Sequence, residues 1–242
     1  MMYLNERIDD LQWGGLRVIQ RADAFRFGTD AVLLADFAAP RRHDRVCDLG
    51  TGTGIIPLLL YARENTISAD AVEIQPDMAD MAARSMAMNG LNEKIRVLPG
   101  DLRSIRTLLP HARYDLVTCN PPYGKAGGTL LNPDASKRLA RHEESCAIED
   151  VACAAAWLLQ NGGRLCCVFP AARMIELSDA MRKYRMAPKR IRMVHSRVEK
   201  AAHLCLMEGM LDARPGLIIE PPLVIYDENN AYTPELRRIY GL

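Results

Sequence analysis

The chain has 242 residues, of which 49% are hydrophobic and 25% charged, and this is enough for one α/β domain with a sizeable core. Its formal net charge of +1 says nothing about a partner, whereas the distribution of the charges along the chain does. Seven cysteines without a CxxC pair argue against a zinc site or a disulfide framework. No apolar run is long enough to cross a bilayer and the amino terminus lacks a signal-peptide pattern, so we expect a cytoplasmic protein without metal.

Strand-like apolar runs alternate with segments of helical periodicity through the middle of the chain. Strands are predicted at 45–49, 70–74, 94–98, 114–119 and 164–169. Helices are predicted at 55–63, 76–88, 148–160 and 171–184. This alternation is typical of a doubly wound α/β fold, in which helices cover both faces of a mostly parallel sheet.

No linker rich in glycine, serine or proline divides the chain, so we expect a single domain over 1–242. Within it, residues 1–40 form an amino-terminal extension that packs on the sheet, 41–212 the core, and 213–242 a carboxyl-terminal tail.

A glycine-rich turn closes the first predicted strand and opens a helix. Asp48 is followed by Gly50, Gly52 and Gly54 in the spacing D-x-G-x-G-x-G, which differs from the G-x-G-x-x-G of dinucleotide-binding proteins. Glycines there permit a tight turn and let a ligand approach the backbone amides at the helix start.

Acidic residues end the next two predicted strands. Glu73 can accept hydrogen bonds from both hydroxyls of a ribose. Asp101, followed by Leu102, can accept one from an exocyclic amine such as that of adenine, although an acid at this position is often only a helix N-cap.

Asn120-Pro121-Pro122-Tyr123 follows the fourth strand. Two successive prolines cannot extend a strand, so this segment is a stiff turn at the sheet edge where open α/β folds bind ligands. By itself the tetrapeptide is equally compatible with a rigid loop that has no chemical role. The glycine turn, the two acids and this tetrapeptide form an ordered set, because each follows its own strand.

With this set, the chain resembles the class I methyltransferases that use S-adenosylmethionine. Its N-P-P-Y tetrapeptide resembles the motif of those members that methylate planar nitrogens. Segments 26–35, 222–226 and 230–235 narrow the resemblance to the bacterial tRNA adenine-N6 methyltransferases that act on adenine 37 of a valine tRNA. The resemblance implies a Rossmann-like, seven-stranded, mostly parallel sheet with one antiparallel edge strand.

The resemblance also implies roles for individual residues. Asp48, Gly50, Gly52 and Gly54 would bind the methionine end of the cofactor, Glu73 its ribose, and Asp101 with Leu102 its adenine. Phe27 and Thr29 would belong to an element that closes over it. Asn120, also counted as a cofactor contact, would hold the target base together with Pro121, Pro122 and Tyr123.

These residue types suit the chemistry of an adenine amine, whose lone pair is delocalised into the ring. The Asn120 side-chain carbonyl and the Pro121 backbone carbonyl can accept its two hydrogens as the nitrogen attacks, and a rigid turn keeps both preorganised. Tyr123 offers an aromatic face to a base taken out of its stack. The sulfonium already activates the methyl carbon, so no metal is needed.

A basic segment from Arg182 to Lys200 carries eight lysines and arginines against one acid, which favours a phosphate-contacting face. An ordinary solvated surface is the alternative. The candidate RNA contacts are Lys125, Arg138, Arg141, Arg190, Arg192 and Arg197.

Two other functions remain open from the sequence. Glutamine-directed methyltransferases of release factors also carry N-P-P-Y, but they have a separate amino-terminal domain for which residues 1–40 are too short. A protein that binds the cofactor and RNA without turnover is the second. We expect RNA, tRNA in particular, as partner and a monomeric protein.

Overall fold

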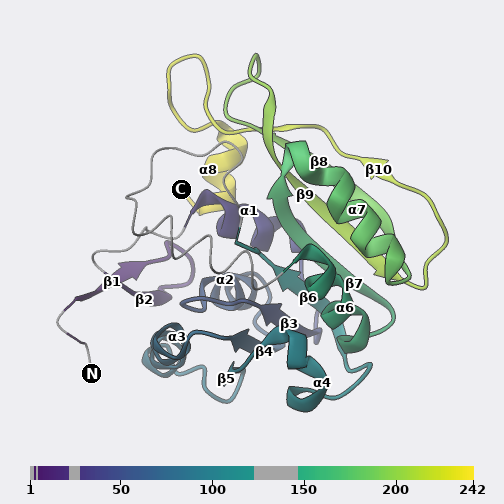
Figure 1. The fold of residues 1–242 in the computed structure, drawn as a ribbon. Coiled ribbons are helices and arrows are strands. Elements are labelled where there is room, and N and C mark those ends of the chain that lie inside the picture. Colours follow the sequence, from purple (N-terminus) through teal and green to yellow (C-terminus); the bar gives the residue numbers. More distant parts are fainter. Residues whose placement is uncertain (1–2, 4, 22–27, 123–146) are drawn as a thin grey trace.

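The computed structural model describes residue 3 and residues 5–21, 28–122 and 147–242 (Figure 1). Nine strands of this part of the chain form one sheet with helices on both faces, as the alternating pattern predicts. In sheet order the long strands are β5 (Ile95–Pro99), β4 (Ser68–Glu73), β3 (Arg45–Leu49), β6 (Tyr114–Cys119), β7 (Leu159–Pro170), β9 (Ala202–Leu211) and β8 (Met186–His195).

The seven long strands match the number expected, and two short ones from the tail add to them. β10 (Ile218–Ile219) and β11 (Leu223–Val224) both pair in parallel with β8, which makes nine. Strands β3 to β7 are parallel, whereas β9 runs antiparallel to β7 and β8, so the antiparallel pairing lies towards the β8 side of the sheet.

The helices follow the strands in the order expected for crossover connections. They are α1 (Thr29–Ala38), α2 (Ile55–Arg63), α3 (Pro76–Met88), α4 (Ile105–Leu108), α6 (Ile148–Leu158), α7 (Met174–Lys183) and α8 (Pro234–Tyr240), with 3₁₀ turns η1 (Leu102–Ser104) and η2 (Ala171–Arg173).

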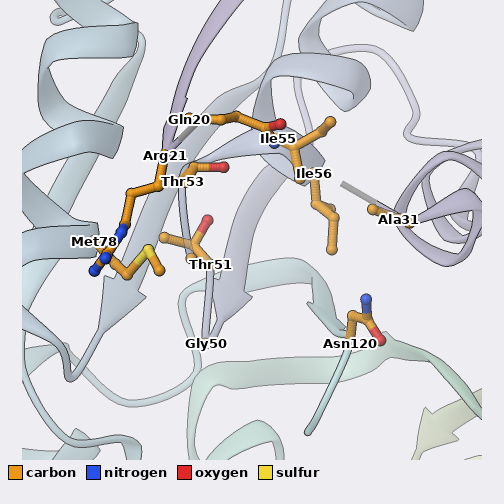
Figure 2. A pocket seen from close by; sticks show the side chains of 12 residues that line it. Gln20, Arg21, Ala31, Gly50, Thr51, Thr53, Ile55, Ile56, Met78 and Asn120 are labelled. Atoms are coloured by element: carbon orange, nitrogen blue, oxygen red, sulfur yellow. The ribbon is translucent and has the colours of Figure 1, made fainter. Parts of the chain in front are cut away.

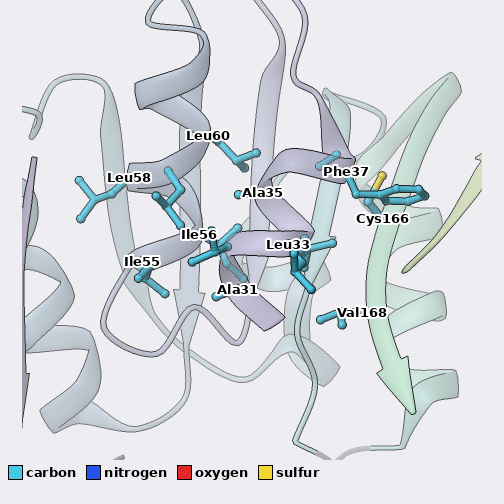
Figure 3. Packing of buried hydrophobic residues seen from close by; sticks show 14 of the residues in the cluster. Ala31, Leu33, Ala35, Phe37, Ile55, Ile56, Leu58, Leu60, Cys166 and Val168 are labelled. Carbon is cyan, nitrogen blue, oxygen red and sulfur yellow. The ribbon is translucent and has the colours of Figure 1, made fainter. Parts of the chain in front are cut away.

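Two hydrophobic clusters cover the two faces of the sheet. Along β7, Cys166 and Val168 pack with α1 and α2, whereas Cys167 and Phe169 pack with α6 and α7 (Figure 3). This alternation follows from the two-residue period of a strand and explains why the strands read as continuous apolar runs.

The amino-terminal segment adds a separate hairpin, β1 (Glu6–Asp10) and β2 (Arg17–Arg21), which is docked on α3. The backbone N–H of Ile19 donates to Ser85 Oγ at 3.0 Å, and that of Arg17 donates to Asn89 Oδ1 at 3.0 Å. The hairpin therefore packs on a helix of the central fold and forms no strand pair with the central sheet.

The tail brings α8 against the first part of the chain. Trp13 Nε1 donates to the Ile239 carbonyl at 3.2 Å, and the Tyr240 hydroxyl donates to Thr29 Oγ1 at 3.2 Å. Thr29 is the first residue of α1, so the tail contacts the amino end of that helix.

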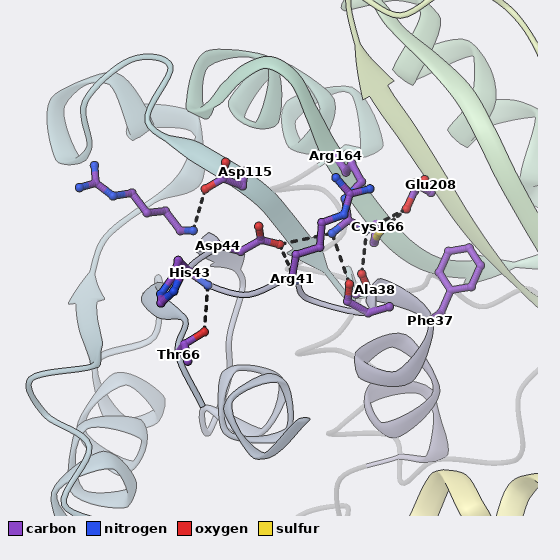
Figure 4. Close-up of polar contacts among 12 residues, drawn as sticks. Phe37, Ala38, Arg41, His43, Asp44, Thr66, Asp115, Arg164, Cys166 and Glu208 are labelled. Atoms are coloured by element: carbon purple, nitrogen blue, oxygen red, sulfur yellow. Dashed lines mark hydrogen bonds and ion pairs between the residues drawn. The ribbon is translucent and has the colours of Figure 1, made fainter. Parts of the chain in front are cut away.

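A buried ion network holds the other end of α1 (Figure 4). Arg164 of β7 donates to the Ala38 carbonyl and to Glu208 of β9, at 2.9 and 3.1 Å. Arg190 of β8 donates to the Phe37 carbonyl at 2.8 Å and to the same Glu208 at 3.1 Å. The two guanidinium groups thereby satisfy carbonyl groups that have no partner within the helix.

Within the described residues, no helix is long and apolar enough to cross a membrane.

Candidate active site

A cavity of about 210 Å³ opens at the carboxyl ends of the parallel strands, where the chain order reverses between β3 and β6 (Figure 2). This switch point is where doubly wound folds bind ligands. Its lining residues are Gln20, Arg21, Gly28, Ala31, Gly50, Thr51, Gly52, Thr53, Ile55, Ile56, Met78 and Asn120.

The glycine turn forms the floor of this cavity. Gly50 and Gly52 have φ of +69° and +57°, and a Cβ added to either would meet no atom within 4 Å. Their bare backbone therefore faces open space that a ligand can occupy. Gly54, with φ of +83°, has a different role, because a Cβ there would lie 2.5 Å from Met86 Cε of α3. It does not line the cavity but allows α2 and α3 to pack closely.

Glu73 joins the glycine turn to the start of α3. Its Oε2 accepts from the Gly52 N–H and its Oε1 from the Gln75 N–H, both at 2.8 Å. The carboxylate is buried, so these two bonds fix its direction before any ligand binds.

Asp48 lies fully buried beneath the turn. Thr118 Oγ1 donates to its Oδ1 at 2.6 Å, whereas Asp48 Oδ2 and Thr51 Oγ1 have no hydrogen-bond partner within the described chain. Burial raises the pKa of Asp48 to about 7, the Thr118 hydrogen bond opposes this rise, and the negative charge of Glu73 adds to it. A carboxyl group in this position suits a cationic ligand above it.

We expect the stability of the ligand-free protein to report this titration. Because the folded state keeps the Asp48 proton up to about pH 7 and the unfolded chain loses it near pH 4, stability falls as pH rises between these values. The free energy of unfolding should therefore decrease between pH 5 and 7 by about 2 kcal/mol more in the wild type than in Asp48→Asn. Urea denaturation measures this difference, with exposed Asp77→Asn as control. Parallel pH profiles for wild type and Asp48→Asn would contradict it.

Asp101 has the geometry of a helix N-cap. Its Oδ1 accepts from the Arg103 N–H at 2.9 Å and its Oδ2 from Arg103 Nε at 2.9 Å, and this side-chain hydrogen bond lowers the pKa of Asp101. The structure thus confirms the alternative role of Asp101, which is to cap the start of η1. Neither Asp101 nor the half-buried Leu102 lines the cavity, so their contact with an adenine stays a prediction.

Among the described residues of the tetrapeptide, 120–122, Asn120 lines the cavity, as Figure 2 shows. Pro121 behind it is buried and Pro122 is exposed. Thr29 stands next to the lining residue Gly28. Five of the predicted site residues lie outside the described residues: Phe27, Tyr123, Lys125, Arg138 and Arg141.

The sequence reasoning missed the lining residues that come from elements outside the motifs. Gln20 and Arg21 come from β2 and Met78 from α3, whereas Ala31 lies within the segment 26–35 that carries the resemblance but was not singled out. Ile55 and Ile56 also line the cavity. Their position directly after the glycine turn is the one sequence signal from which they could have been predicted.

Three arginines of the basic segment have partners within the protein. Arg190 pairs with Glu208 and Glu220, and Arg192 pairs with Glu235 at 2.8 Å. Arg197 donates to the Asp227 carbonyl at 3.1 Å and to the Asn230 side chain. Intramolecular acceptors thus hold the three guanidinium groups in place, and their contact with RNA phosphates stays a prediction.

Three features surround the cavity: the glycine turn after β3, the oriented acid Glu73 at the end of β4, and Asn120 after β6. Together they are the features of a Rossmann-like methyltransferase that uses S-adenosylmethionine. Residues 22–190 match the methyltransferase small domain. The chain belongs to this family and, within it, to that of the tRNA1(Val) (adenine(37)-N6)-methyltransferases. It is 32% identical to such an enzyme of Porphyromonas gingivalis, over 91% of this chain and 89% of the relative. It is 34% identical to one of Tolumonas auensis, over 88% and 86%.

Solved structures share the fold. A protein of Agrobacterium tumefaciens described as a predicted O-methyltransferase has a TM-score of 0.72 and 24% identity, over 88% of this chain and 95% of that one. TrmN of Thermus thermophilus has a TM-score of 0.55 and 23% identity, over 76% and 48%. Among the described residues, no three His, Cys, Asp or Glu side chains are grouped so that they could hold a metal ion.

Proposed function

We propose that the protein transfers a methyl group from S-adenosylmethionine to the N6 amine of an adenine in RNA, with adenine 37 of a valine tRNA as the target. The observation that carries this proposal is the position of Asn120 on the wall of the cavity above the glycine turn. The names of the curated relatives support the choice of nucleotide.

The residues around the cavity fit the cofactor. Gly50 and Gly52 leave room for its methionine end, Glu73 would accept from its ribose, and Asp48 places a buried carboxyl group near its positive charges. When bound, the cofactor supplies a methyl carbon activated by a sulfonium. Asp101 and Leu102 would contact its adenine, and Thr29 lies beside the cavity at the start of α1.

The chain's own contribution to the reaction is positioning. Asn120 presents a side-chain carbonyl and Pro121 a backbone carbonyl as acceptors for the two amine hydrogens. Both follow a buried strand and a rigid proline pair, so their reorganisation on reaction is small. The target base would be taken out of its stack to reach them.

The test is to incubate the enzyme and labelled cofactor with total tRNA, DNA and release factor in parallel. Nucleoside mass spectrometry should find N6-methyladenosine in the tRNA pool, at a single anticodon-loop position. Label in release factor would instead identify a glutamine-directed enzyme. Cofactor and tRNA binding without label would identify a binding protein that does not turn over.

A tRNA substrate also implies where the protein works and with what. We propose that it acts in the cytoplasm, as a monomer, with tRNA as its macromolecular partner and without a metal. Sedimentation equilibrium of the protein with and without tRNA measures the stoichiometry.

A further inference from the structure

The cofactor cavity has one charged side chain on its wall among the described lining residues, Arg21. The two acids of the site lie elsewhere. Asp48 is buried below the turn, and Glu73 binds the turn from behind through the Gly52 N–H. The cavity therefore has a cation on one side and carboxyl groups beneath its floor.

The position of Arg21 is set by the docked hairpin and not by the sheet. Arg21 ends β2, and the hydrogen bonds of Ile19 to Ser85 and of Arg17 to Asn89 fix this strand on α3. Arg84 of α3 adds an ion pair to Glu6 of β1. The same helix contributes Met78, which lies beside Arg21 on the cavity wall in Figure 2.

The Arg21 side chain extends towards Met78 in Figure 2, whereas that of the preceding residue, Gln20, extends towards Ile55. Gln20 is 4% exposed and also lines the cavity. Arg7 Nη2 of β1 donates to Gln20 Oε1 at 3.5 Å, so this amide is held within the hairpin.

We propose that Arg21 binds the carboxylate of the cofactor's amino-acid moiety. S-adenosylmethionine carries two positive charges, on sulfur and on the ammonium group, and one negative charge, on this carboxylate. Arg21 on the wall complements the carboxylate of the cofactor. The carboxyl groups of Asp48 and Glu73 below the floor suit its sulfonium and ammonium groups. A guanidinium is the side chain best matched to a carboxylate. The amino-terminal hairpin is then part of the cofactor site, whatever substrate is methylated.

The experiment compares two ligands that differ only in the carboxylate. Isothermal titration calorimetry measures the affinity of wild type, Arg21→Met and Arg17→Met for S-adenosylmethionine and for decarboxylated S-adenosylmethionine. Arg17 lies on the same strand and is exposed outside the cavity, so it is the matched control. Arg21→Met should weaken binding of the intact cofactor by about 10- to 100-fold and leave the decarboxylated ligand unchanged. Arg17→Met should affect neither.

Two results would overturn the proposal. Equal weakening of both ligands would show that Arg21 only shapes the cavity, and equal affinity of Arg21→Met and wild type for the intact cofactor would show that it makes no contact. Should Arg21→Met fail to fold, as judged by circular dichroism, Arg21→Lys takes its place, because it keeps the charge and loses the bidentate geometry. It should show a smaller weakening, again only for the intact cofactor. No RNA is needed, so the outcome is independent of the proposed substrate.

Discussion

Replacing Asn120 with alanine should abolish methyl transfer while cofactor affinity stays close to that of the wild type. The side-chain carbonyl would accept a hydrogen from the reacting amine, and this bond strengthens only as the nitrogen attacks. Loss of one such preorganised group typically lowers kcat by about 100- to 1,000-fold. Turnover is measured with labelled cofactor and tRNA, and cofactor affinity by calorimetry.

Asn92→Ala is a suitable control, since Asn92 is exposed and lies outside the cofactor cavity. Full activity of Asn120→Ala would reject the proposed role of the tetrapeptide. Loss of cofactor binding in the same variant would instead place Asn120 among the cofactor contacts, as the resemblance also implies.

Replacing Glu208 with alanine should be the most destabilising change outside the active site. Glu208 and Arg164 are each 5% exposed, and Glu208 is shared by Arg164 and Arg190. Its removal leaves the buried Arg164 with only Asp44, 3.4 Å away, as a carboxylate partner. Breaking a buried ion pair in this way costs roughly 3–5 kcal/mol of stability. Urea denaturation at neutral pH measures the loss.

Glu220→Ala provides the contrast. Glu220 is more exposed and pairs only with Arg190, so its loss should cost about 0–1 kcal/mol. Similar small losses of stability for both variants would contradict this prediction, because they would show that water solvates Arg164 once Glu208 is removed. The double change Arg164→Met with Glu208→Leu removes both buried charges and should recover much of the stability that Glu208→Ala loses.

Periodicity predicted the strands and helices of the parallel core, because each is long enough to show its pattern. The boundary between α6 and β7 shows where it fails. The Asn161-Gly162-Gly163 segment reads as a helix stop before a strand at Arg164, whereas α6 ends at Leu158 and β7 begins at Leu159. Gly162 has φ of +78°, and the β6–β7 register shifts between Tyr114 and Leu116. An irregularity in the pairing with β6 therefore continues β7 through residues that resemble a turn.

A count of charges along the sequence cannot show which of them are paired. Arg190 lies directly opposite Glu208 in the β8–β9 register, and Glu220 and Glu235 arrive from the tail. The acids that pair with Arg190 and Arg192 are thus 18 to 43 residues away in sequence and adjacent in space. The contribution of β2 to the cavity escaped prediction for the same reason, since it depends on contacts with Ser85 and Asn89 of α3.

The contacts of α8 also bear on the order in which the protein assembles during its synthesis. Trp13 and Ile239 are 226 residues apart and Thr29 and Tyr240 are 211 apart. Loop entropy grows only slowly with length, so these contacts cost little more in stability than shorter ones. They cannot form, however, before residue 240 has been made, while the preceding sheet can already fold. The amino end of α1, beside the cofactor cavity, therefore gains its contact with Tyr240 later in synthesis than the strands of the parallel sheet gain theirs with one another.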